Sequence, residues 1–433
     1  MQTASPLAAA QQRFNVSSSI HPLYPLEQQA LQILQRQGLP TAKDEAYRHT
    51  PITQVLSEKF DLSQPASQAS IAPNNLQAPL CSVIDAYHFI FVNGRLDWEN
   101  SQLLGSEQYL QLLSFQDAYT QYGREFVHHA TQGWDTTSDA FTALNMLLRE
   151  ESTFVYIKPH AIVDKPLVFH YLVDARQQPT TVAPRCLVVA GENSEVNFIA
   201  TWHTLGSLPS FTNACAHIVV EKAARFNHYT LQTQDSAQAY HVNHLTFRQA
   251  RQSVLNTYTF TWSSAMVRNN LNVRLEGSYS EANLYGLCYP SGRQHTDNHT
   301  QVYHYSPHTR SNELYKSIVH EAATGVFNGK IYVKREAQKA RAFQANHNIV
   351  LSGTAAVYTE PQLEIWADDV KCSHGATTGQ LDQQALFYLR TRGISESTAR
   401  HILLRAFTHE VIDRVPLPAL SNYLLEGIDQ LAI

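Results

Sequence analysis

The sequence predicts a mainly β protein, with a solenoid core and helical segments on both sides of it. Helical periodicity is absent between residues 153 and 374, where short β-rich runs alternate with polar turns. Within this region asparagine recurs in strand-like sequence at intervals of 30, 29, 27 and 29 residues. A repeat of this length is typical of coils that stack their inward apolar residues. The asparagines are Asn197, Asn227, Asn256, Asn283 and Asn312.

Stacked asparagines can hydrogen-bond along the axis of a solenoid, as they do in other repetitive β structures. Five asparagines at near-equal intervals also arise by chance. On the residues alone, a pair of β-sandwiches therefore stays open as the alternative fold.

The composition limits the class of protein and of partner. With 433 residues and 43% hydrophobic content, the chain is long enough to bury a substantial core. The formal net charge of -5 and the pI near 6.5 give no reason to expect nucleic acid or an anionic membrane as the main partner.

The cysteines are far apart and odd in number, which favours reduced thiols over a disulfide framework. They are Cys81, Cys186, Cys215, Cys288 and Cys372.

The N-terminal stretch has no apolar segment of signal-peptide length, and no segment approaches the roughly 18 apolar residues of a membrane helix. We therefore predict a cytoplasmic protein.

Residues 1–150 are predicted to form a mainly helical domain. Apolar residues at helical spacing predict a helix over residues 24–37, which a glycine follows directly. Residues 88–92 predict a strand that runs into an Asn-Gly turn. A further amphipathic helix is predicted within residues 136–149.

Residues 375–433 return to helical periodicity. Asp382 can cap one helix, and Ser395 can cap a second. The apolar spacing of residues 420–431 predicts a third. Three short amphipathic helices can close the end of a solenoid core.

The Cys-x-His pair Cys372 and His374 stands where strand-like sequence gives way to helix-like sequence. Alternate side chains of an extended strand point to the same face, so the pair would present a thiol and an imidazole together. These groups suit Zn, Fe or Cu, but two ligands do not complete a tetrahedral site, so a second surface would have to supply the rest. The structural alternative is a buried apolar cysteine beside a hydrogen-bonded core histidine.

Several stretches of the sequence resemble the SufB/SufD family, the scaffold subunits of the SUF iron-sulfur cluster assembly machine. They are Gly38-Leu39-Pro40-Thr41, Phe327-Asn328-Gly329-Lys330-Ile331 and residues 368–377, 379–382 and 387–394. The Cys-Ser-His-Gly sequence at residues 372–375 resembles the D-type branch of the family. The resemblance implies a right-handed parallel β-helix over residues 151–374, between helical domains over residues 1–150 and 375–433.

The resemblance also implies a function. Such a chain would be a non-catalytic scaffold subunit that pairs with a SufB-type paralogue through the C-terminal end of the β-helix and binds a SufC-type ABC ATPase through its terminal helices. A nascent iron-sulfur cluster would be held transiently at the paralogue interface, with His374 and Cys372 as candidate metal ligands shared with the partner subunit. The resemblance allows flavin in the assembled complex and leaves open a homodimer of the isolated chain. The candidate partner-binding residues are Asp382, Phe387, Leu389, Arg390, Arg392 and Gly393.

The alternative function is a stand-alone β-helix enzyme, either metal-dependent or carbohydrate-active. No carboxylate cluster repeats along the coils, and residues 325–330 lack the spacing and the Ser or Thr of a phosphate loop. The histidine pairs His295 with His299 and His304 with His308 are weaker metal candidates, because their surroundings are turn-like and β-like. Co-purification with an ATPase and a paralogue would favour the scaffold, whereas turnover by the isolated chain would favour the enzyme.

Overall fold

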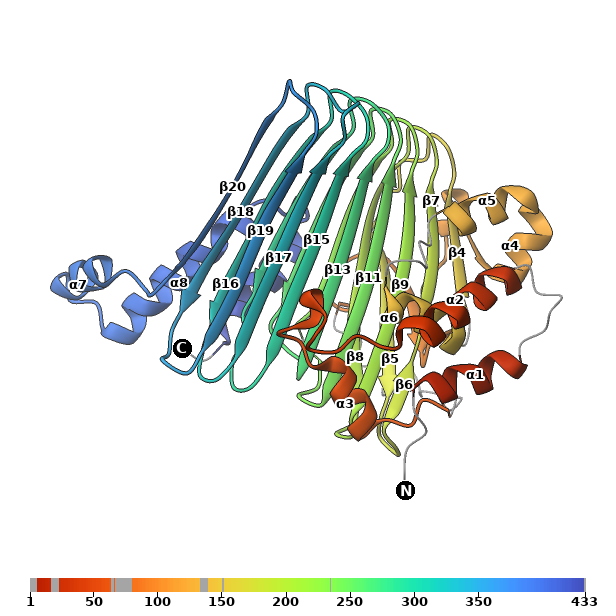
Figure 1. Ribbon diagram of the computed structural model, residues 1–433. Coiled ribbons are helices and arrows are strands. Elements are labelled where there is room, and N and C mark those ends of the chain that lie inside the picture. The colour runs from red at the N-terminus through yellow and green to blue at the C-terminus, as the bar shows by residue number, and fades with distance from the viewer. Residues whose placement is uncertain are drawn as a thin grey trace.

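The computed structural model describes residues 6–16, 23–63, 66, 80–132, 139–149, 152–233 and 235–431. Its centre is a β-solenoid of about eight coils, each of which contributes one strand to each of two sheets (Figure 1). Helices lie near both ends of the chain. The predicted fold class, a mainly β solenoid with helices at its two ends, is confirmed, and the β-sandwich alternative is wrong.

The two sheets face each other across the core, and we call them sheet A and sheet B. The strands of sheet A are β1 (Tyr87–Val92), β2 (Arg95–Leu96), β5 (Leu167–Asp174), β8 (Glu195–Leu205), β10 (Arg225–Gln232), β12 (Val254–Thr261), β14 (Glu281–Cys288), β16 (Arg310–Val319), β18 (Arg341–Val350) and β20 (Lys371–Gly379). The strands of sheet B are β3 (Leu110–Ser114), β4 (Ser152–Ile157), β6 (Thr180–Val182), β7 (Arg185–Ala190), β9 (Ser210–Val220), β11 (Ala239–Gln249), β13 (Met266–Leu275), β15 (His295–His304), β17 (Thr324–Val333) and β19 (Ala356–Ile365).

The strand order shows how the coils stack. Sheet A runs β2–β1–β5–β8–β10–β12–β14–β16–β18–β20, and sheet B runs β19–β17–β15–β13–β11–β9–β7–β4–β3, with β6 paired to β9. Neighbouring strands are parallel except at the first coil, where β2 lies antiparallel to β1 and β3 antiparallel to β4. The apolar side chains between the sheets form the main core, to which Phe169, Phe198, Phe226 and Phe247 contribute fully buried or nearly buried rings.

The asparagine repeat is a continuous ladder on sheet A. The five asparagines are register partners in β8, β10, β12, β14 and β16. Each Nδ2 donates to the Oδ1 of the asparagine one coil earlier, at 3.0, 2.7, 3.0 and 2.9 Å. The sequence prediction of stacked asparagines is confirmed. The ladder ends at Asn312, whose partner in β18 is Phe343.

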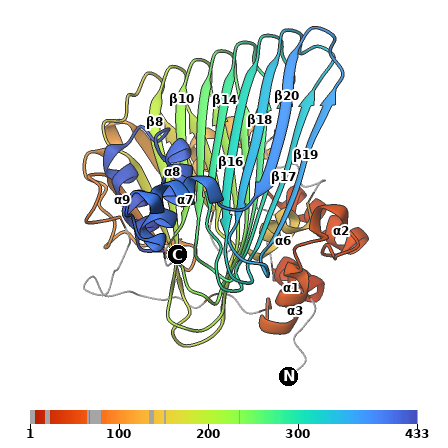
Figure 2. The ribbon, with the colours of Figure 1, turned by 90° about the vertical axis from the view of Figure 1, so that its left-hand side faces the viewer.

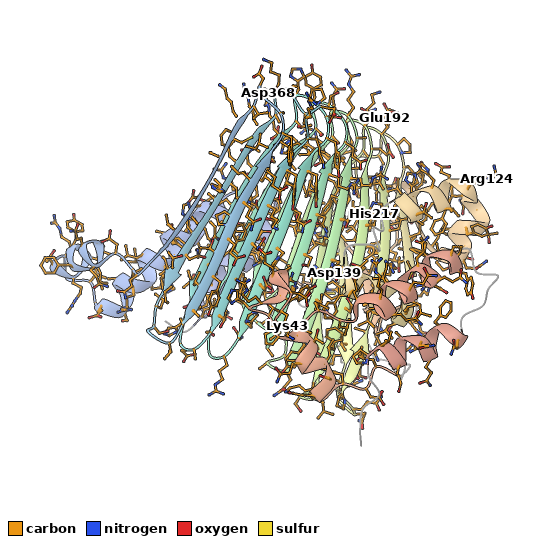
Figure 3. All side chains as sticks on the ribbon, in the orientation of Figure 1. Lys43, Arg124, Asp139, Glu192, His217 and Asp368 are labelled. Carbon is orange, nitrogen blue, oxygen red and sulfur yellow. The ribbon has the colours of Figure 1, made fainter. Side chains whose placement is uncertain are left out.

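One row of turns repeats a left-handed residue from coil to coil. Its backbone N–H donates to a carbonyl of the following coil, as from Ala223 to Arg251 at 3.0 Å and from Lys339 to Asp369 at 2.7 Å. The left-handed conformation costs roughly 1 kcal/mol per residue, which the inter-coil hydrogen bond offsets. Figure 3 labels Glu192 and Asp368 along this row. The left-handed residues are His160, Asn193, Ala223, Gln252, Tyr279, His308 and Lys339.

Helices of the N-terminal part cover the outer face of sheet B (Figures 1 and 2). They are α1 (Pro6–Val16), α2 (Tyr24–Gln37), α3 (Ile52–Lys59), α4 (Phe115–Tyr122), α5 (Arg124–Gln132) and α6 (Ala140–Leu148). The predicted helix over residues 24–37 is α2, and the helix predicted within residues 136–149 is α6, although residues 136–138 lie outside the described part. Helix and sheet share a second apolar cluster that includes Phe141 and Phe211.

The helices of the C-terminal part are α7 (Gln383–Thr391), α8 (Glu396–Ile412) and α9 (Pro418–Asp429). Helices α8 and α9 lie on the outer face of sheet A, as Figure 2 shows, and α7 packs against α8. The predicted caps are confirmed: Asp382 accepts from the backbone N–H groups of Gln384 and Ala385, and Ser395 accepts from that of Thr398. None of the described helices combines the length and the apolar character that crossing a membrane requires.

The domain boundaries at residues 150 and 374 stay predictions. β1 and β2 extend sheet A, and β3 extends sheet B, although all three precede residue 150. β20 continues five residues beyond His374, to Gly379. The sheets therefore reach past both predicted boundaries.

Candidate functional site

The last coil leaves two strand edges uncovered. Among the strands that the structure describes, β19 and β20 each pair on one side only, with β17 and β18, and stand last in their sheets. None of the nine residues of β20 is buried, and Cys372 alone is half-buried. We call β19 and β20 the open end of the solenoid. Such an edge presents unpaired N–H and C=O groups that can pair with another chain.

Cys372 and His374 occupy inward-facing positions at this open end. Cys372 is the register partner of buried Ala342 and packs against the main core. His374 is the partner of buried Gln344, so its side chain stands on the same inward face and is exposed at the last coil. The predicted pair is therefore brought together on one face of one strand.

The two side chains differ in their surroundings. Burial raises the pKa of the Cys372 thiol, against a smaller lowering by the backbone of Ala342. At neutral pH the sulfur is thus a thiol, and it binds a metal ion only by losing its proton. No third His, Cys, Asp or Glu of the described residues completes a three-ligand group around Cys372 and His374.

A polar seam lies beneath His374 in the interior. Glu313, Gln344 and His374 are successive register partners in β16, β18 and β20. The Nε2 of Gln344 donates to Oε2 of Glu313 at 2.7 Å, and burial raises the pKa of Glu313 to about 7. Sequence reasoning missed Glu313 and Gln344. The signal was present, because the three residues stand 31 and 30 residues apart, which is the period of the asparagine ladder.

The seam extends across the last two coils. The hydroxyl of Thr359 in β19 donates to Oδ1 of Asn346 at 2.9 Å, and Asn348 donates to the same oxygen at 2.6 Å. Polar side chains therefore lie beside the apolar residues that end the core, and the hydrogen bond from Thr359 to Asn346 joins the two sheets.

A second Cys-x-His pair shows the structural alternative. Cys215 and His217 alternate along β9, and both are buried against the N-terminal helices. Burial raises the pKa of Cys215 to about 12 and lowers that of His217 to about 3. The sequence pattern is the same as at residues 372–374, but this pair is sealed inside the protein.

The predicted partner-binding residues gather on and around α7. Asp382 caps the helix, Phe387, Arg390, Arg392 and Gly393 are exposed, and Leu389 is half-buried. Arg390 forms an ion pair with Glu396 at 3.3 Å. Gly393 follows the helix with a φ of 85°, which is left-handed and suits glycine.

Helix α7 presents aromatic side chains to solvent. Phe387 is 70% exposed and its neighbour Tyr388 is 56% exposed. Figure 1 shows α7 projecting to the side of the last coils, away from the solenoid. Exposed adjacent aromatic rings on a projecting helix are typical of a docking surface.

Helices α8 and α9 anchor α7 to the solenoid. Apolar residues of both helices, such as Leu404 and Leu424, share a buried cluster with the outer face of sheet A. Lys316 of β16 forms an ion pair with Glu410 and donates to the carbonyl of Phe407 at 3.0 Å. The chain after β20 is therefore fixed to the coils that precede it.

The histidine pairs of β15 and the turn after it have other partners. His295 contacts the hydroxyl of Thr50 at 3.0 Å, and His299 lies 2.9 Å from Asp297. Both lie under the segment before α3, where Arg268 pairs with Asp297 at 2.7 Å. These two histidines thus belong to a polar contact between sheet B and the N-terminal part.

His304 and His308 do not meet. Both ring nitrogens of His304 are hydrogen-bonded inside the solenoid, to Thr309 at 2.8 Å and Ser311 at 3.0 Å. His308 stacks on Tyr279 at 4.7 Å in the row of turns. The structure does not join this pair at one site.

Comparison with known families and proteins agrees with this architecture. A model described as "SUF system FeS cluster assembly, SufBD core domain" matches residues 171–407, and one described as "SufBD protein N-terminal region" matches residues 7–168. The chain is 30% identical over 411 residues to the iron-sulfur cluster assembly protein SufD of Escherichia coli, covering 94% of this chain and 92% of that protein. It is 29% identical over 411 residues to an iron-sulfur cluster assembly SufBD family protein of Synechocystis, covering 93% and 89%. A chloroplastic protein of Arabidopsis thaliana, ABCI7, is 27% identical over 412 residues, covering 92% of this chain and 84% of that protein. The chain therefore belongs to the SufBD family of the SUF iron-sulfur cluster assembly system and is a homologue of SufD.

Proposed function

We propose that this chain is a non-catalytic scaffold subunit that pairs with a SufB-type paralogue through the open end of its solenoid. The single observation that carries the proposal is the placement of Cys372 and His374 on the exposed terminal strand β20, facing inward. A related solenoid that added its own last strands to β19 and β20 would continue both sheets. The two metal-ligating side chains would then lie between the subunits.

The iron-sulfur cluster is the cargo of this interface. Such clusters are usually held by about four thiolate or equivalent ligands, and this chain offers two at the open end. The partner subunit supplies the others. Flavin binding, which the family resemblance allows, belongs to the assembled complex in this proposal.

In the absence of the paralogue, the same edges can pair with a second copy of this chain. A twofold arrangement would place β20 of each copy against the other. A homodimer that dissociates when the paralogue is added is the expected behaviour of the isolated protein, measured by sedimentation.

The cluster role of His374 is tested by co-expression with the paralogue and the ATPase. His374→Ala and His374→Gln should lower the yield of assembled cluster at least about tenfold, because loss of a coordinating group weakens a metal site by that order. Co-purification of the partners should persist. His374→Cys supplies a thiol at the same place and serves as the third variant.

The matched control is Thr378→Ala, which removes an exposed inward side chain from the same strand. Thr378→Ala should leave both the cluster yield and the co-purification of the partners unchanged. A cluster yield equal to that of the wild type in His374→Gln would contradict the assignment of His374 as a metal ligand. Loss of partner co-purification with His374→Ala, restored by Gln, would instead assign the side chain to packing.

We also propose that α7 docks a SufC-type ABC ATPase. The exposed rings of Phe387 and Tyr388 support this, since aromatic anchors often contribute about 2 kcal/mol or more to an interface. Phe387→Glu should weaken ATPase binding roughly 30-fold. Gln384→Glu, on the same helix and with the same added charge, is the control.

A point substitution is a better test than truncation. Removing the chain after Asp382 would also remove α8 and α9 and uncover the apolar cluster on sheet A. Loss of binding would then follow from misfolding. Unchanged ATPase affinity in Phe387→Glu would contradict the docking proposal.

A further inference from the structure

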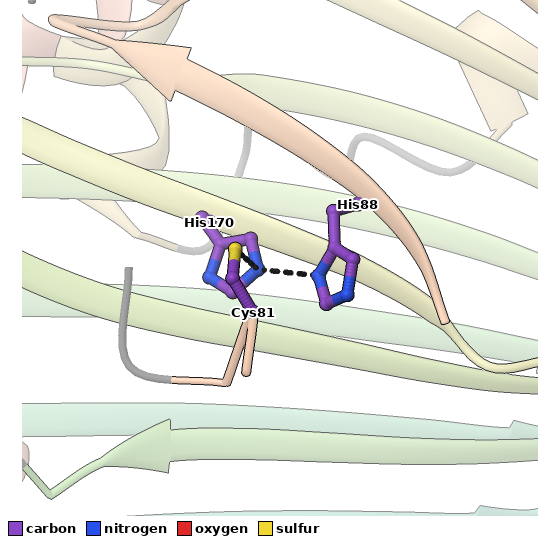
Figure 4. A group of neighbouring side chains, drawn as sticks. All are labelled: Cys81, His88 and His170. Atoms are coloured by element: carbon purple, nitrogen blue, oxygen red, sulfur yellow. Dashed lines mark hydrogen bonds between the residues drawn. The ribbon is translucent and has the colours of Figure 1, made fainter. Parts of the chain in front are cut away.

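A cysteine and two histidines converge at the first coil, far from the open end. His88 lies on β1 and His170 on the neighbouring β5, on the outer face of sheet A. Cys81 belongs to the segment that precedes β1 and folds over this face. Figure 4 shows the three side chains directed toward one another. β1 and β5 lie at the opposite end of sheet A from β20.

The ligand atoms have the spacing of a metal site. Cys81 Sγ lies 3.7 Å from His170 Nε2, and His88 Nδ1 lies 3.0 Å from the same nitrogen. All three atoms are within 4.8 Å of one another. Around a tetrahedral zinc ion, with bonds of about 2.0–2.3 Å, a sulfur and a nitrogen stand about 3.6 Å apart and two nitrogens about 3.3 Å. The two separations from His170 Nε2 are therefore within a few tenths of an ångström of these values, and Cys81 Sγ and His88 Nδ1 would have to approach each other by at most about 1.2 Å.

The other ring nitrogens are already held. His88 Nε2 lies 3.3 Å from the carbonyl oxygen of Ile84, which can only accept, so this nitrogen carries the proton and Nδ1 keeps its lone pair. His170 Nδ1 lies 2.9 Å from the hydroxyl of Thr201. A hydrogen bond from the outer nitrogen to a carbonyl or hydroxyl is the usual support of a metal-binding histidine.

The protonation states suit a cation. Burial lowers the pKa of His170 to about 3, with His88 as a second cause, and burial also lowers the pKa of His88. Both imidazoles are thus neutral near pH 7. Burial raises the pKa of the Cys81 thiol, so that its proton would leave only when a metal ion takes its place.

The three candidate ligands have apolar neighbours on one side, and on the other side they are partly accessible to solvent. His88 and His170 are buried beside Ile90, while Cys81 is half-buried. Leu80 and Ile84, from the Cys81 segment, share the buried cluster on which α8 and α9 pack. An ion at this position would fix that segment to β1 and β5.

We propose that Cys81, His88 and His170 form a Zn²⁺ site with three protein ligands, separate from the cluster interface at the open end. A thiolate with two imidazoles is a ligand set that zinc favours. The fourth ligand is water, which reaches the ion past the half-buried Cys81. The site ties the segment before β1 to the first coil.

The test uses the full chain, stripped with a chelator under reducing conditions and titrated with Co²⁺ as a spectroscopic probe. One equivalent should bind with a thiolate-to-cobalt charge-transfer band. Cys81→Ser should abolish the band, and His170→Gln should weaken binding at least about tenfold. Added Zn²⁺ should raise the unfolding temperature of the wild type but not of Cys81→Ser.

Cys372→Ser is the matched control and should keep the band. Absence of a band in the wild type, or a band that survives Cys81→Ser and disappears in Cys372→Ser, would overturn the proposal. The three side chains would then be a hydrogen-bonded histidine pair packed by a thiol. Cys81→Ser replaces one half-buried sulfur by oxygen, so the result does not depend on whether the His170 variant folds. Partner proteins are absent from the assay, so its outcome is independent of the cluster role of His374.

Discussion

The first and last coils of the solenoid share one backbone geometry but differ in their side chains. β5 of the first coil buries all its residues except Asp174, whereas β20 buries none. The first coil is filled by aromatic rings, with Phe169 4.5 Å from both Phe89 and Phe198. The last coils bury smaller apolar side chains, such as Ile331, Val333 and Ala342, together with the polar side chains of the seam.

The two ends also finish their sheets differently. At the first coil, the short antiparallel strands β2 and β3 end the sheets, and α4 packs on β3 and β4. At the last coil, β19 and β20 are long and parallel and keep their outer edges free of other described strands. A repeat protein needs a polar cap or a partner at each end. One end is therefore closed by strands and a helix of this chain, whereas the other leaves two long strand edges to which the proposed partner could pair.

The largest expected difference between the ends is in packing. Phe169→Ala removes a fully buried ring and should lower the free energy of unfolding by about 3–5 kcal/mol. Thr378→Ala at the open end should change it by at most about 1 kcal/mol, because that side chain is exposed and loses only a long hydrogen bond from Asn348, at 3.4 Å. Denaturant unfolding of the isolated chain measures both. Equal losses would mean that the open end packs as tightly as the first coil.

The next effect concerns the buried carboxylate of the seam. Because burial raises the pKa of Glu313 from 4.5 to about 7, the folded state holds this proton more tightly than the unfolded state does. The contribution of Glu313 to stability is therefore greatest below pH 4.5 and is lost as the pH rises to 7, by up to roughly 3 kcal/mol. Glu313→Gln should remove this loss and make the protein more stable than wild type at pH 8, but not at pH 5.

The control for this pH dependence is Glu336→Gln, at an exposed position, which should leave stability within about 0.5 kcal/mol at both pH values. Denaturant unfolding at pH 5 and pH 8 gives the comparison. A Glu313→Gln protein that lost stability at pH 8 would mean that the carboxylate is ionised and stabilising in the fold.

The smallest effect distinguishes the middle of the asparagine ladder from its end. Asn256 both donates and accepts within the ladder, whereas Asn312 donates to Asn283 and meets Phe343 on its other side. Asn256→Ala should cost about 2 kcal/mol and Asn312→Ala about 1 kcal/mol, in proportion to the hydrogen bonds lost. Urea unfolding measures the two values. Identical losses would show that the ladder does not act bond by bond.

Much of the fold could be predicted because its signals are local or periodic. The intervals between the asparagines indicated the length of one coil. Asp382 and Ser395 correctly predicted where two helices begin. Cys372 and His374 could be placed on one strand face because alternation along a strand needs no tertiary information.

What the sequence did not reveal depends on contacts between distant residues. His88 and His170 are 82 residues apart, and they meet only because β1 pairs with β5 in sheet A. The continuation of β20 to Gly379 was missed because both faces of that strand are exposed, so it carries no apolar alternation. Glu313 and Gln344 were not predicted as part of the site because the residue type at this register position changes from one coil to the next.

The uncovered edges of β19 and β20 also bear on how the chain is made. Ribosomes extend a chain by about 5–20 residues per second, so a coil of about thirty residues emerges every few seconds. Each new coil covers the edges of the one before and exposes a fresh pair, which is an aggregation hazard until the next coil arrives. Among the described strands, β19 and β20 are the last to appear and stay uncovered. Partner pairing at these strands would thus select chains whose solenoid is already complete, and it would end the exposure that began with the first coil.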